Sequence, residues 1–159
     1  PAPGFADLVV KLLSNPKIYE RDLDDLVEEL AELPPEDIRR LTGAIPAAES
    51  NCSRQGAHLT DDFLDVLVRA GAWPAAVQVT RQAVDRLEDT RWDRPRKLRA
   101  RARQAAAELE FAAASGQTAD VTACAARWQE VIGEIKKDDE ENRKARSPLR
   151  GLRLPNSSE

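Results

Sequence analysis

The chain has 159 residues, of which 42% are hydrophobic, 33% are charged and 4% are aromatic. This length and balance indicate one folded domain, or two very small ones, and exclude wholesale disorder. The few aromatic residues beside many alanines and leucines disfavour a β-sandwich, and the net charge of −4 disfavours a dedicated nucleic-acid-binding protein.

Three short helices are predicted within residues 1–46, which we expect to form an N-terminal helical subdomain. Apolar residues recur at helical spacing over 5–13 and, more clearly, over 22–33, where the remaining faces are acidic. A third helix is predicted directly afterwards, because Pro35 can occupy a first helical turn and the carboxylate of Glu36 suits the positive end of the helix dipole.

Residues 47–59 are predicted to form a loop between two helical parts of the chain. The sequence AAESNCSRQGAH has no apolar period and many turn-forming residues. It places Cys52 six positions before His58, the only histidine, which raises a Cys–His nucleophile pair as a hypothesis. No phosphate-binding glycine loop, zinc-binding helix or nucleophile elbow accompanies them, so no catalytic residues, metal or cofactor are predicted.

Residues 60–145 are predicted to form a stack of antiparallel helices. Its first helix, 60–70, begins at Thr60, a good N-cap residue, and is apolar almost all round, which indicates burial between neighbours. Gly71 marks a tight turn, and 73–87 forms the partner helix.

This turn and partner helix resemble the second helix of a tetratricopeptide repeat. In that family a glycine forms the turn between helices, an aromatic residue packs back on the first helix, and two alanines seven positions apart allow close helix packing. The residues that fit this order are Gly71, Trp73, Ala76 and Ala83. The resemblance covers about residues 60–135, and Leu64 stands where the family has a small residue. It implies a stack of helical hairpins with a peptide-binding groove and no catalysis.

Two long helices are predicted to complete the stack. The first runs over 95–115 with a leucine- and alanine-rich side, and the second over 118–144 with an apolar stripe that stops at Ile135. Residues 146–159 are predicted to be a disordered tail, which is either a linker to a further domain or a short docking peptide.

The charges are distributed unevenly along the chain. Residues 20–37 hold nine acids and one base, whereas 91–103 hold seven bases and one acid. Most of these bases lie away from the apolar side of the helix 95–115 and must face solvent or a partner. Trp92, in the charged link before this helix, is the best aromatic candidate for an interface. The predicted partner-binding residues are Trp92, Arg94, Arg96, Lys97, Arg99, Arg101 and Arg103.

Three interpretations of this basic surface remain open. It is a solvated face that pairs with the acidic helix 22–32, a surface for an acidic protein partner, or a nucleic-acid surface. The third interpretation is weakened because no aromatic stacking residues are interleaved with the bases.

Together these features predict an all-α protein of six to seven helices, arranged as antiparallel hairpins in a tetratricopeptide-like stack or a bundle. We expect a non-enzymatic protein–protein interaction module, an adaptor, scaffold or regulatory subunit that binds another protein through a charged helical surface. The alternative is a nucleic-acid-associated regulatory protein that uses the basic face of the helix 95–115. Since no apolar run could cross a bilayer and no signal peptide is visible, we expect a soluble, cytoplasmic protein without a membrane partner.

Overall fold

The computed structural model describes residues 4–88 and 90–153, with side chains up to Ala145. These residues form helices and no strand, which confirms the all-α prediction. The eight helices are α1 (Phe5–Ser14), α2 (Glu20–Glu32), α3 (Pro35–Arg40), α4 (Ala44–Arg54), α5 (Asp61–Arg69), α6 (Trp73–Arg86), α7 (Arg94–Ser115) and α8 (Thr118–Arg153).

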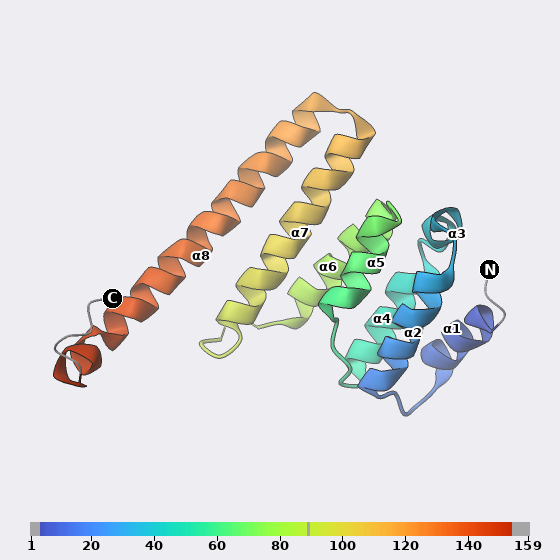
Figure 1. The fold of residues 1–159 in the computed structure, drawn as a ribbon, viewed down its shortest axis with the longest axis horizontal. Helices are drawn as coiled ribbons and strands as arrows, with labels where there is room; N and C mark the ends of the chain where they lie inside the picture. Colours follow the sequence, from blue (N-terminus) through green and yellow to red (C-terminus); the bar gives the residue numbers. More distant parts are fainter. Residues whose placement is uncertain (1–3, 89, 154–159) are drawn as a thin grey trace.

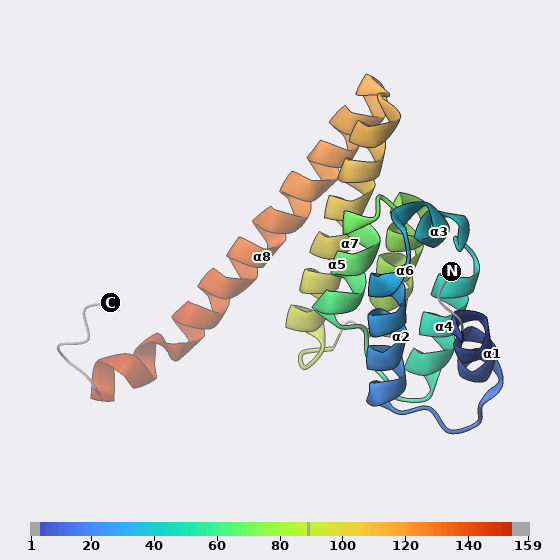
Figure 2. The same cartoon turned by 45° about the vertical axis from the view of Figure 1, so that its right-hand side comes forward.

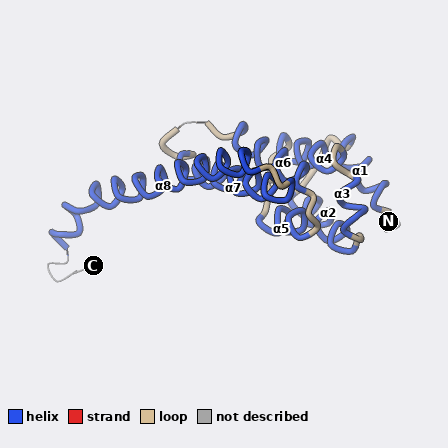
Figure 3. The backbone as a smooth tube through the Cα atoms, turned by 90° about the horizontal axis from the view of Figure 1, so that it is seen from above, coloured by secondary structure: helices blue, strands red, loops and turns tan. Residues whose placement is uncertain are grey.

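The helices follow one another in space in nearly the order of the sequence. Helices α1–α4 lie at one end, α5 and α6 in the middle, and α7 and α8 form a long hairpin at the other end (Figures 1 and 2). Helix α7 packs on α6 and on α8, whereas α8 packs chiefly on α7. The far part of α8 therefore extends away from the body (Figure 3).

Local sequence signals account for where several helices begin and end. The Thr60 hydroxyl accepts a hydrogen bond of 3.2 Å from the backbone N–H of Phe63 and so caps α5. The carboxylate of Asp22 accepts one of 2.7 Å from the backbone N–H of Tyr19 at the start of α2. Helix α7 ends at Gly116, whose φ of 72° lies in the left-handed region that glycine tolerates.

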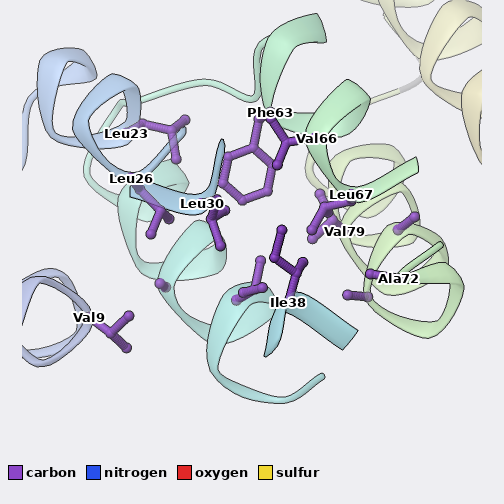
Figure 4. Close-up of a cluster of buried hydrophobic side chains, with 14 of the residues drawn as sticks. Val9, Leu23, Leu26, Leu30, Ile38, Phe63, Val66, Leu67, Ala72 and Val79 are labelled. Carbon is purple, nitrogen blue, oxygen red and sulfur yellow. The ribbon is translucent and has the colours of Figure 1, made fainter. Parts of the chain in front are cut away.

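One hydrophobic core joins the two parts of the chain. Phe63 and Leu67 of α5 are fully buried; the Phe63 ring lies beside Leu30 of α2, and Leu67 lies beside Val79 of α6 (Figure 4). The same cluster reaches from α1 to Ala107 of α7. Residues 1–46 and the stack that follows thus share their interior.

The prediction of a loop over 47–59 is wrong for residues 47–54, which belong to α4. This helix buries Ile45, Ala48 and Cys52, but it also buries the polar side chains of Glu49 and Asn51. The Asn51 amide donates a hydrogen bond to the backbone carbonyl of Leu12. Since polar residues occupy buried positions, the apolar period is too weak to reveal the helix.

The predicted disordered tail, 146–159, is helical as far as Arg153, and residues 154–159 lie outside the described residues. The charged part of α8 before it has no apolar side that could favour helix by packing. Opposite charges one turn apart support the helix there, as in the 3.6 Å pair between Lys144 and Glu140.

Candidate partner-binding site

The basic residues of α7 form two rows on different sides of the helix. Within each row the residues are three and then four positions apart, so that they lie on the same side of the helix. The first row is Arg94, Lys97 and Arg101, and it lines a space shared with Glu134 and Asp138 of α8. The second row is Arg96, Arg99 and Arg103, and it lines a separate pocket toward α4 and α6.

The first row links α7 to α8. Arg101 donates from Nη1 and Nη2 to the two carboxylate oxygens of Glu134, at 2.6 and 3.2 Å. Arg94 Nε lies 3.0 Å from Asp138 Oδ1. The acidic helix 22–32, which the sequence suggested as the partner of the basic face, supplies none of these carboxylates. They come instead from α8, the other helix of the α7–α8 hairpin. Arg94 and Arg101 therefore have a structural role.

Glu134 provides a test of this link. The hydrogen bonds from Arg101 lower the pKa of Glu134 below its usual 4.5, so the ion pair stabilises the fold above that pH and the contribution is lost as the pH falls through the folded-state pKa. We expect Glu134→Gln to lower the free energy of unfolding at pH 7 by less than about 1 kcal/mol, because about a third of each side chain is exposed. Urea denaturation at pH 7 and pH 3 measures this, and the difference from the native protein should be smaller at pH 3 than at pH 7. The exposed Glu130 of the same helix is the control, and a Glu134→Gln effect independent of pH would contradict the assignment.

The second row forms part of a pocket of about 590 Å³, here called the arginine pocket. Its lining comes from α4, the α4–α5 loop, α6, the link after α6, and α7. Asp93 is the one acid among the described residues that line it. The basic residues that line the arginine pocket are Arg54, His58, Arg86, Arg96, Arg99 and Arg103.

A buried ion pair fixes Arg86 in the wall of the arginine pocket. Its Nη1 and Nη2 donate to the two carboxylate oxygens of Glu49 at 2.6 and 2.8 Å, and Nη1 also donates to Ser53 Oγ at 2.7 Å. Glu49 is 0% exposed and lies behind the arginine. A carboxylate in this position is stable in the interior because a bidentate cation and a hydroxyl satisfy it.

The other arginines of the pocket are more exposed than Arg86 and make fewer contacts. Arg96 Nη1 lies 3.6 Å from Asp93, and Arg103 contacts Asp61 at the start of α5. Arg54 donates to the neutral amide of Asn51 at 3.2 Å. Arg99 is exposed and has no ion pair with the described residues. Part of the arginines' donor capacity is therefore available to a bound molecule.

Trp92 lies on the surface and is next in sequence to a residue of the arginine pocket. Its side chain is 84% exposed, the most exposed large hydrophobic side chain of the described residues, and it directly precedes the pocket residue Asp93. The Arg91 guanidinium lies 5.9 Å from the centre of its ring. An exposed tryptophan supplies a large contact area at little entropic cost when a partner covers it.

The sequence suggested neither Arg54 nor Arg86 as a site residue. Both come from segments far from 91–103, and no pattern along the chain connects them. The structure disfavours the Cys52–His58 hypothesis on the cysteine side, because Cys52 is 0% exposed and burial raises the pKa of its thiol to about 11. His58 is exposed and lines the arginine pocket.

Within 4–88 and 90–153, no helix combines the length and apolarity required to cross a membrane. The same residues contain no group of three or more histidine, cysteine or acidic side chains placed to hold a metal ion. No protein-family model, curated protein or solved structure matches the chain.

Proposed function

We propose that this protein is a non-enzymatic interaction module that binds an acidic segment of a protein partner in the arginine pocket, and that the exposed Trp92, which directly precedes the pocket residue Asp93, adds to the contact. The observation that carries the proposal is the convergence of five arginines and His58 from separate segments on one pocket, in which Asp93 is the single acid among the described lining residues. Such an excess of positive charge attracts an acidic partner and favours correct docking.

The composition of this surface also favours a protein partner over nucleic acid. Arginine and tryptophan are the residues that most often dominate binding energy at protein interfaces. Arg94 and Arg101 of the first basic row pair with carboxylates of α8, so the continuous basic face required for tracking a phosphate backbone is interrupted. The resemblance of the turn after α5 to a tetratricopeptide repeat agrees with a peptide-binding role and stays a prediction.

The test is a charge reversal of the second row, Arg96→Glu with Arg99→Glu and Arg103→Glu. A fluorescent oligoglutamate peptide serves as the acidic probe, and its affinity is measured by anisotropy at physiological ionic strength. We expect the reversal to weaken binding by more than about 100-fold, because arginine hot spots each contribute about 2 kcal/mol or more.

The control reverses three exposed bases on α2, on α3 and on the link between α1 and α2, so that the net charge changes equally. The control residues are Lys17, Arg21 and Arg40. Equal losses in both variants would mean that only overall charge matters, and an unchanged affinity in the second-row variant would overturn the proposed site. Tighter binding of a single-stranded oligonucleotide, with a steep dependence on salt, would favour the nucleic-acid alternative instead.

A further inference from the structure

We infer that the arginine pocket accepts a phosphoryl group, carried by a phosphorylated serine, threonine or tyrosine of the partner's acidic segment. This inference rests on the proposed function and names the chemistry that the pocket recognises. It follows from the balance of charge, from the hydrogen-bond donors that remain available, and from the shape of the pocket.

The charge balance fits a dianion better than a carboxylate. Five arginines line the pocket, and the carboxylates that contact them are Glu49, Asp61 and Asp93. Among the described residues, Arg54 and Arg99 therefore have no carboxylate partner, which leaves two positive charges without compensation there. A phosphate monoester carries between about 1.5 and 2 negative charges at pH 7, whereas one glutamate supplies a single charge.

The available donors lie on the α7 side of the pocket. Arg86 already uses both terminal nitrogens on Glu49 and forms a fixed positive wall. Arg99 has no ion pair with the described residues, and Arg96 has one contact of 3.6 Å, so their guanidinium N–H groups can turn to a ligand. The planar guanidinium fork matches two phosphate oxygens at once, and three such oxygens can be shared among several arginines.

The shape of the pocket also suits a side chain that enters from a partner. Its volume of about 590 Å³ lies within the range of ligand-binding sites, about 300 to 1,000 Å³. Leu59, Leu87 and Ala100 contribute apolar lining, which excludes part of the water and strengthens the attraction between a phosphate and the arginines.

The test compares three peptides that differ at one position. The first has a phosphoserine between glutamates, the second has serine there, and the third has glutamate. We expect the phosphoserine peptide to bind at least about tenfold more tightly than the glutamate peptide, because the phosphate carries more negative charge and one more acceptor oxygen than a carboxylate. Equal affinities of the phosphoserine and glutamate peptides would overturn the inference.

Substitutions in the pocket test whether the preference for the phosphoserine peptide arises there. Arg99→Gln should remove most of the preference for phosphoserine, whereas Lys17→Gln, at an exposed position that does not line the pocket, should leave it unchanged. Inorganic phosphate should compete with the phosphoserine peptide, and acetate at the same ionic strength should compete much less. A phosphoserine preference that survives in Arg99→Gln and in Arg96→Gln would place phosphate elsewhere and overturn the assignment.

The inference and the proposed function can fail separately. If the second-row reversal abolishes oligoglutamate binding but phosphoserine brings no gain, the acidic-partner site stands and the phosphoryl assignment is wrong. If phosphate binds the pocket but the reversal leaves oligoglutamate binding unchanged, the phosphoryl site stands and the proposed function is wrong.

Discussion

Replacing Glu49 by leucine is expected to lower the free energy of unfolding by about 3 kcal/mol. The substitution removes the carboxylate that holds both terminal nitrogens of Arg86 and leaves a largely buried cation without its partner. The loss lies at the lower end of the range for such pairs, because the Arg86 side chain is 27% exposed and can recover some hydration. Urea denaturation monitored by circular dichroism measures it.

A double variant distinguishes the cost of leaving the Arg86 charge unpaired from the cost of changed packing at Glu49. When Arg86→Leu is added to Glu49→Leu, no charge remains unpaired, and we expect most of the stability to return. Glu28→Leu, at an exposed position of α2, is the surface control and should change stability little. A double variant no more stable than Glu49→Leu alone would show that the cost of the single substitution is not the unpaired charge.

Phe63→Ala is expected to destabilise the fold by about 3 to 5 kcal/mol. Phe63 is the largest fully buried side chain and lies between α2 and α6, so its loss leaves a cavity that the surrounding leucines cannot fill. In a chain of this size the melting temperature should fall by about 10 °C. Thermal and urea denaturation together provide the measurement.

Phe111→Ala is the matched control for this core substitution. The same atoms are removed, but the Phe111 side chain is 38% exposed on α7. Its loss should cost clearly less than that of Phe63, since part of the side chain is already hydrated. Comparable costs at the two positions would contradict the placement of the core around α5.

The amino-acid pattern predicted the helices whose buried positions are apolar. Leu23, Leu26 and Leu30 made α2 evident, and the turn at Gly71 separated α5 from α6. Helix α4 was missed because Glu49 and Asn51 are buried through polar contacts with α6 and with α1, and such contacts leave no period in the sequence.

The candidate site could be predicted only in part for a similar reason. The bases of 91–103 are adjacent in sequence, so their surplus of charge is visible without a structure. Their division into two rows also follows from the helical spacing, but which row faces α8 depends on tertiary packing. Arg54 and Arg86 enter the pocket from α4 and α6, and only the fold brings them to α7.

The length of α8 is largely independent of the stability of the core. Because this helix packs chiefly on α7, its distal residues can be added or deleted without touching the interior formed by α1–α7. Each inserted residue would advance the tip by about 1.5 Å and rotate it by about 100° around the helix axis. Insertions or deletions in the distal part of α8 would therefore change the distance between its tip and the arginine pocket without changing the packing of the core.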